Sequence, residues 1–181
     1  MVTKGMGQMY KRFVSSVLAV MMLIGVTIGG ATSVAADTDY TCPDNSCSFT
    51  VPDYYSKLDS DSTSITFKDA DSGGVFAVLV SPNFPGAATL DDVATVLVDQ
   101  FSQSAGYQAG ASGVQTTKLG TTPARSFSFL SNNSSGVQVD TVVFFAVNQG
   151  RLYALTFAAT PDKADTFVTS AKDVFASFSF M

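Results

Sequence analysis

The sequence predicts an α+β fold, an antiparallel β-sheet with two packed helices, in the order βββ-α-ββββ-α-β. Three observations favour this fold. Apolar and polar residues alternate over several short segments, which is typical of half-buried strands. Two longer segments place apolar residues three or four positions apart, which is typical of helices. Short runs rich in glycine, proline, asparagine and aspartate separate these segments, as expected for tight turns.

The first half of the sequence contains three predicted strands. Residues 48–51 form a short strand that Pro52 ends. Residues 64–68 and 75–80 lie on either side of a polar loop, 69–74, and are expected to pair as a hairpin.

A helix is predicted to begin after Thr89. Threonine is a favoured N-cap residue, and Asp91 and Asp92 place negative charge in the first turn, where it suits the helix dipole. Gly106 is expected to end the helix. The buried stripe is predicted to consist of Leu90, Val93, Ala94, Leu97 and Phe101.

Four strands are predicted next, at residues 115–119, 124–130, 137–147 and 152–158. Asn148-Gln149-Gly150 is a typical short hairpin turn between the last two. Residues 142–147 are apolar at every position, so we expect a central strand covered on both faces, with Phe144 buried in the core.

The C-terminal segment is predicted to be a helix and a last strand. Thr160 and Pro161 suit the N-cap and first positions of a helix. The strand is expected at residues 177–180. The buried stripe of the helix is predicted to consist of Ala164, Phe167, Val168, Ala171, Val174 and Phe175.

Residues 1–36 have the order of a secretory signal peptide. Three basic residues come first, an apolar run covers residues 17–28, and small residues follow up to Ala36. We expect cleavage after Ala36, with cleavage after Ala35 as a close alternative. The apolar run is shorter than the ~20 residues that span a bilayer. An uncleaved membrane anchor is the alternative.

The rest of the chain divides into a short N-terminal lead, 37–46, and a single domain, 47–181. Cys42, in the lead, and Cys47, at the start of the domain, are the only cysteines, so the lead contains the start of a candidate disulfide loop. In an exported protein so close a pair most simply forms a disulfide, with free or redox-active thiols as the alternative. A loop this small contributes about 2 kcal/mol by the chain-entropy model.

The charge balance excludes whole classes of partner. Seven basic and fifteen acidic residues follow position 36, which gives a net charge of −8 after cleavage. Such a chain is repelled by the phosphates of nucleic acid and by anionic lipid. We therefore exclude nucleic acid, and expect contact with a membrane only through an uncleaved leader. Arg125 and Arg151, the only arginines after the leader, are either charges that protect strand edges or anchors for an anionic group.

The chain contains no histidine, glutamate or tryptophan. Without histidine, a Ser-His-Asp or Cys-His arrangement cannot be built. We therefore predict no enzyme: no catalytic residue, no cofactor, no cofactor-binding residue and no metal ligand. An Asp-dependent hydrolase is the remaining catalytic alternative. Its candidates are the pairs Asp59/Asp61, Asp69/Asp71 and Asp91/Asp92, together with Asp99 and Asp140, the two aspartates placed where burial would raise a pKa.

The loop at residues 69–74 is the best candidate for a metal site. It begins like a calcium-binding loop, with Asp69 and Asp71 two positions apart and glycine following. Val80 stands at the twelfth position, where such loops place a bidentate glutamate. A tight hairpin turn explains the same residues, and weak calcium binding at Asp69/Asp71 stays open.

Three local motifs accompany the order of elements. They are Phe49-Thr50-Val51-Pro52, the turn Gly120-Thr121-Thr122-Pro123-Ala124-Arg125, and the ending 167–180, which finishes in Ser-Phe and Met181. With them, residues 45–181 resemble the PsbP-like (Mog–PsbP) fold family of small secreted bacterial domains. The family's tryptophan after the first proline is replaced here by Tyr54 and Tyr55.

We therefore expect an exported, secreted or cell-envelope domain that acts as a non-enzymatic binding or accessory module. Its partner is an unidentified protein or a small apolar ligand, because the missing catalytic inventory is combined with an apolar-rich sheet and helices. The resemblance implies one further alternative, an accessory protein associated with a photosystem. Fold resemblance does not by itself assign function.

Overall fold

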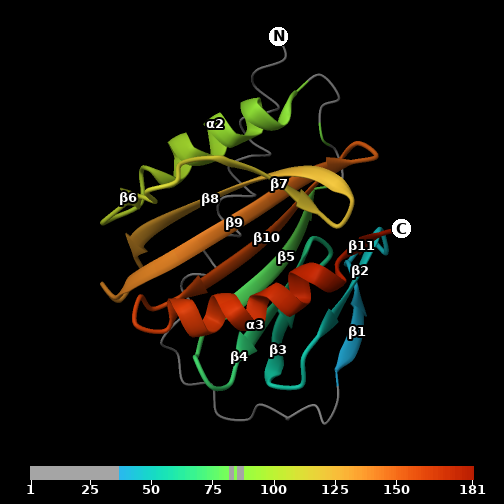
Figure 1. Ribbon diagram of the computed structural model, residues 1–181, viewed down its shortest axis with the longest axis horizontal. Coiled ribbons are helices and arrows are strands. Elements are labelled where there is room, and N and C mark those ends of the chain that lie inside the picture. The colour runs from blue at the N-terminus through green and yellow to red at the C-terminus, as the bar shows by residue number, and fades with distance from the viewer. Residues whose placement is uncertain (1–36, 82–83, 85–87) are drawn as a thin grey trace.

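The computed structural model describes residues 37–81, 84 and 88–181, which form two β-sheets and two helices (Figure 1). The leader, 1–36, lies outside the described residues, so its cleavage stays a prediction. Every strand pair among the described residues is antiparallel. The α+β fold predicted from the sequence is confirmed.

The larger sheet has eight strands, with β10 and β9 near its centre. Its strands, in spatial order, are β3 (Tyr55–Ser60), β4 (Ser64–Asp69), β5 (Val75–Ser81), β10 (Arg151–Ala159), β9 (Gln138–Asn148), β8 (Thr122–Asn132) and β6 (Gln108–Ala109), and β7 (Gln115–Leu119) also pairs with β8. The smaller sheet has the order β1 (Thr38–Thr41), β2 (Cys47–Val51) and β11 (Ser179–Phe180).

The two helices pack on opposite faces of the larger sheet. Helix α2 (Leu90–Phe101) contributes Val93, Leu97 and Phe101 to a buried cluster with Phe127 and Phe145. Helix α3 (Ala164–Ser177) and the small sheet lie together on the other face, where a second cluster forms. Successive strand residues point to opposite faces, so neighbours in the sequence enter different cores.

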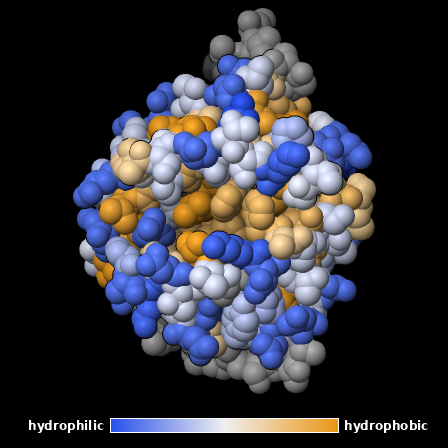
Figure 2. Space-filling view, in the orientation of Figure 1, coloured by the Kyte–Doolittle hydropathy of each residue, from blue (hydrophilic) through white to orange (hydrophobic). Residues whose placement is uncertain are grey.

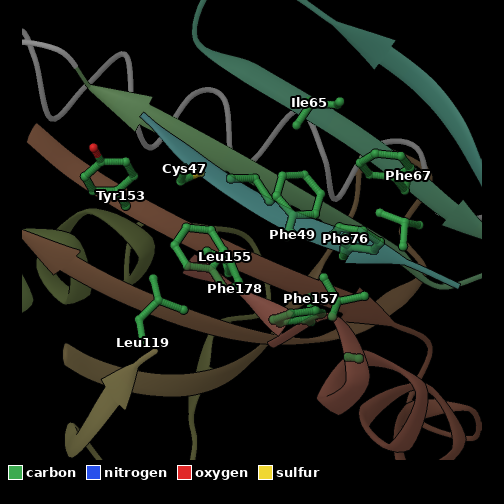
Figure 3. Close-up of a cluster of buried hydrophobic side chains, with 14 of the residues drawn as sticks. Cys47, Phe49, Ile65, Phe67, Phe76, Leu119, Tyr153, Leu155, Phe157 and Phe178 are labelled. Atoms are coloured by element: carbon green, nitrogen blue, oxygen red, sulfur yellow. The ribbon is translucent and has the colours of Figure 1, made fainter. Parts of the chain in front are cut away.

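Aromatic rings hold the small sheet and α3 against the large sheet. Phe49 of β2 meets the rings of Phe67 in β4 and Phe76 in β5 edge-on, with centroids 6.0 and 6.5 Å apart. It also stacks on Phe178, which follows α3, at 6.3 Å. Figure 3 shows these rings gathered between β2, β5 and β10. Phe167, Ala171 and Val174 of α3 are buried in this core, as the helical spacing predicts. Val168, predicted to be buried with them, is exposed, so that part of the prediction is wrong.

Three strands were not predicted from the sequence, and the described order is βββββ-α-βββββ-α-β. Strand β1 forms within the predicted polar lead and pairs with β2 through its backbone. Strand β3 buries only Tyr55 fully and is interrupted by a bulge after Lys57, and β6 has two residues. Strands at sheet edges bury few side chains, so apolar alternation is too weak to reveal them.

The helix ends differ in part from expectation. Thr89 is the N-cap of α2 in a capping box: its hydroxyl accepts from the Asp92 N–H, and its own N–H donates to the Asp92 carboxylate at 2.8 Å. The helix ends at Phe101, five residues before Gly106. Helix α3 begins at Ala164, with Lys163 and not Thr160 as its N-cap. The backbone oxygen of Thr160 accepts from the Lys163 N–H in a separate turn before the helix.

Cys42 and Cys47 form a disulfide with Cα atoms 5.1 Å apart, as predicted. The loop that they close also contacts the large sheet, because Asp44 Oδ2 lies 3.0 Å from Arg151 Nε at the start of β10. The division into a short lead, 37–46, and a single domain, 47–181, remains a prediction.

Candidate functional site

Strand β9 lies near the centre of the sheet, but its α2 face is covered more completely than its α3 face. On the α2 face, Val143 and Phe145 are completely buried. On the α3 face, Val142 and Phe144 are half-buried, so the prediction that Phe144 is a fully buried core residue is wrong. The reason is the position of α3, which packs against β2 and β10 rather than over β9 and β8.

The uncovered strip of sheet beside α3 forms a groove, which we call the α3 groove. Its floor is Val142 and Phe144 of β9 with their β8 neighbours, and its wall is one side of α3. Phe144 and Phe175 bring floor and wall together, with ring centroids 4.7 Å apart. In Figure 2 an apolar band, in orange, crosses this hollowed part of the face. The groove residues are Ser126, Ser128, Leu130, Val142, Phe144, Val168 and Phe175.

Val168 belongs to the wall by helix geometry. It precedes Phe175 by seven residues, which is two turns, so both project from the same side of α3. Val168 is 39% exposed, one of the most exposed large apolar side chains of the described residues. An apolar residue is thus presented at the rim of an apolar floor.

The alternation Ser126-Phe127-Ser128-Phe129 of β8 explains why the floor remains open. Phe127 and Phe129 are buried toward α2, while Ser126 and Ser128 pair with Phe144 and Val142 on the α3 side. Two short polar side chains offer no apolar surface on which a helix could pack, so this half of the sheet stays uncovered.

One end of the α3 groove is closed. The turn between β7 and β8 touches the residue that ends α3: a Cβ built on Gly120 would lie 2.9 Å from the backbone oxygen of Phe178. Leu119, Ala124 and Ala146 are fully buried at this end. The groove is therefore a trough that a ligand enters from the opposite end or from above.

The other end of the groove is acidic. Asp140 lies on the same face of β9 as Val142 and Phe144 and is half-buried. Burial raises the pKa of Asp140, and the charge of Asp165, in the first turn of α3, raises it further, against an opposing hydrogen bond from the Thr141 N–H. A carboxyl group with a raised pKa destabilises the fold once it is ionised, so stability falls as the pH rises above the ordinary aspartate range.

No protein-family model matches the chain, and no curated protein matches it. Among solved structures, the cyanobacterial PsbP (CyanoP) of Synechocystis sp. PCC 6803 is similar, with a TM-score of 0.60 and 19% identity over 86% of this chain and 99% of that one. The chain has the PsbP-like fold.

Two further structures share this PsbP-like fold. LpqN of Mycobacterium tuberculosis, described as involved in cell envelope biogenesis, matches with a TM-score of 0.56 and 15% identity over 84% of this chain and 99% of its own. The Ran-binding protein Mog1p of Saccharomyces cerevisiae matches with a TM-score of 0.56 and 9% identity over 83% and 96%. At these identities the likeness shows the fold alone.

The motifs that carried the resemblance lie at strand ends, in a turn and at the last helix of this structure. Phe49, Thr50 and Val51 end strand β2; Gly120 and Thr121 form the turn between β7 and β8, and residues 122–125 begin β8. The ending 167–180 is most of α3 followed by β11. Tyr55, one of the two residues that replace the tryptophan, is buried against Phe76 with ring centroids 4.9 Å apart.

The paired aspartates proposed as catalytic candidates serve turns and helix ends. Asp61 accepts from the N–H groups of Thr63 and Ser64, hydrogen bonds that lower its pKa despite partial burial. Asp91 pairs with Arg125 at 2.8 Å, and Asp92 caps α2, where the bonds from Thr89 lower its pKa. Asp99 is exposed two turns further along α2, on the side that lines a hollow with Asp91.

Asp69 of the calcium-loop candidate is buried and belongs to the hairpin turn. Its Oδ1 accepts from the N–H groups of Asp71 at 2.8 Å and Ser72 at 3.0 Å. No cluster of three or more residues suited to a metal ion occurs in the part of the chain that the structure describes. The turn interpretation accounts for this loop, and calcium binding there stays untested.

The structure also shows a hollow that the sequence did not predict. It measures about 370 Å³ and lies beside α2, lined by Asp91, Ala94, Thr95, Val98, Asp99 and Val114. Arg125, one of the two candidate anion anchors, pairs with Asp91 at this rim, and Arg151 pairs with Asp44. Both arginines therefore hold elements of the fold together. No helix in the described ranges is long and apolar enough to cross a membrane.

Proposed function

We propose that this chain is an exported, non-enzymatic binding domain that holds an apolar part of its partner in the α3 groove. The observation that carries the proposal is the central strand β9, whose Val142 and Phe144 are only half-buried although residues 142–147 are all apolar. Apolar side chains left open in a hollow on a well-packed sheet favour a binding surface. The secretory pattern of residues 1–36 supports export.

The chemistry of the chain supports binding rather than catalysis. The sequence has no histidine or glutamate, and its paired aspartates are engaged in turns, a helix cap and an ion pair. Proton transfer near neutral pH would require a carboxylate whose pKa is well above its ordinary value. The pKa of Asp140 is raised in this direction, but Asp140 lies at the end of an apolar trough with a second aspartate as its neighbour.

Neither narrower alternative is favoured by a particular observation. The likeness to CyanoP concerns the fold, so an association with a photosystem rests on resemblance alone. For the hydrolase alternative, the carboxylates that come together among the described residues are Asp140 with Asp165, and Asp91 with Asp99 at the hollow beside α2, where Asp91 is held by Arg125.

The test is recovery of partners from envelope extract with two matched variants. Val168 and Val137 are 39% and 41% exposed, but only Val168 borders the groove, since Val137 lies at the β8–β9 turn. Val168→Gln is expected to weaken retention of the partner about five-fold, because about 1 kcal/mol of apolar burial is lost. Val137→Gln is expected to retain the partner like the unchanged chain.

Unfolding midpoints of both variants are measured alongside, because both positions are exposed and the fold should tolerate either change. Equal retention by the two variants would show that the groove is not the binding surface. Turnover of a substrate that survives Val168→Gln would contradict the non-enzymatic proposal.

A further inference from the structure

The shape of the α3 groove restricts the kind of molecule that fits it. The wall from Ala164 to Phe175 rises about 1.5 Å per residue, so it is about 16 Å long. Sites for small ligands enclose most of the ligand surface. This groove is a shallow trough open along its length (Figure 2), which suits a short helix or extended segment of a protein better than a small molecule.

The floor and wall of the trough present apolar groups in a line. Leu130, Val142 and Phe144 form the floor, and Val168 and Phe175 face them from α3. A partner helix would meet such a line with apolar residues at positions i, i+3, i+4 and i+7. Ser126 and Ser128 add hydroxyl groups on the floor, which can bond polar groups at the edge of the partner's apolar stripe.

The open end of the trough carries two carboxylates without a cation. Asp140, on the α3 face of β9, and Asp165, in the first turn of α3, flank this end; the pKa of Asp140 is raised by burial and further by the charge of Asp165. Among the described residues, the ion pairs join Arg125 to Asp91 and Arg151 to Asp44, so neither Asp140 nor Asp165 has a basic side chain as its partner. A cation at this end would relieve the repulsion between the two carboxylates.

The charge of the rest of the chain points in the same direction. The net charge after residue 36 is −8, which disfavours an anionic lipid surface and nucleic acid as occupants. It attracts basic segments over a distance and speeds their association. Charge and shape together thus indicate a cationic and apolar protein segment.

We propose that the occupant of the α3 groove is a basic amphipathic segment of a partner protein, whose apolar stripe covers Val142 and Phe144 and whose lysine or arginine pairs with Asp140 and Asp165. This inference rests on the proposed function and names the chemistry of its partner. The partner's cation lies at the open end, and its apolar residues extend toward the closed end at Gly120 and Phe178.

The experiment measures binding of three labelled fourteen-residue probe peptides to the full chain by fluorescence anisotropy. All three have leucine at helical spacing, with lysine, glutamine or glutamate as the polar residue. The lysine probe is expected to bind about ten-fold more tightly than the glutamine probe, and its affinity should fall as salt is added. The glutamate probe is expected to bind most weakly.

The carboxylates are tested with two double variants that remove the same charge. Asp140→Asn with Asp165→Asn is expected to bring the lysine probe down to the affinity of the glutamine probe, about a ten-fold loss. Asp99→Asn with Asp173→Asn is the control and should change little, because Asp99 is on α2 and Asp173 lies on the Tyr54 side of α3. Loss of folding is not expected at Asp140, whose ionised form opposes folding.

The outcomes separate this inference from the proposed function. If the lysine and glutamine probes bind equally and Val168→Gln weakens both, the groove is a binding surface but its occupant is not basic, and the inference is wrong. If no probe responds to Val168→Gln, both the inference and the proposed function fail. Stronger binding to vesicles of anionic lipid than to the lysine probe would also overturn the inference in favour of a membrane.

Discussion

Replacing Phe145 with alanine is expected to lower the free energy of unfolding by about 3–5 kcal/mol, whereas the same change at Phe144 should cost about half as much. Phe145 is 0% exposed and points toward α2, where its ring contacts that of Phe127 at 6.2 Å between centroids. Truncation there leaves a cavity that neighbouring residues cannot fill. Phe144 already borders solvent, so water can occupy part of the space that its ring vacates.

Urea unfolding of Phe145→Ala and Phe144→Ala measures this difference directly. The two phenylalanines are adjacent on one strand, so propensity and local backbone effects are the same for both. Equal losses of stability would mean that the α3 side of β9 is as fully packed as the α2 side. In that case no groove would exist beside α3.

Replacing Gly74 with alanine is expected to cost about 1–3 kcal/mol, although the change adds a single methyl group. A Cβ at this position would collide with Cδ2 of the Phe167 ring and lie 2.6 Å from its Cγ. The ring of Phe167 is buried against Tyr55 and Phe157, so it cannot turn aside. Helix α3 would have to move, and the wall of the α3 groove would move with it.

A double-mutant cycle tests this cause. In the background of Phe167→Leu, a smaller and more adaptable side chain, Gly74→Ala should cost less than half of what it costs in the unchanged chain. A loss that is the same in both backgrounds would show that contact with Phe167 is not the reason for glycine at this position. The cost would then lie in the backbone of the β4–β5 hairpin instead.

The interior of the fold could be predicted from the sequence because buried apolar residues recur with the period of a strand or a helix. The alternation of Phe127 and Phe129 with serines gave strand β8, and the spacing of Leu97 and Phe101 gave α2. Thr89 also marked its helix end correctly, since a side chain performs the cap locally. Strands β1, β3 and β6 bury little and are held by backbone hydrogen bonds, which leave no pattern in the side chains.

The candidate site could not be predicted, because it depends on where α3 comes to rest. The sequence of β9 is apolar on both faces, which is the pattern of a covered central strand. Nothing in that strand shows that α3 packs against β2 and β10 and leaves Val142 and Phe144 partly open. The serines at positions 126 and 128 were the one local sign that the neighbouring strand has no cover on this face.

Photo-crosslinking in the cell tests the central claim, that a partner occupies the α3 groove, most directly. Benzoylphenylalanine is placed at Val168 in the wall of the groove, at Val137 on the β8–β9 turn, or at Val114 beside α2, all exposed positions. We expect illumination to join a partner to the chain from position 168 and not from positions 137 or 114. An adduct that forms from position 114 or 137 but not from 168 would contradict the claim.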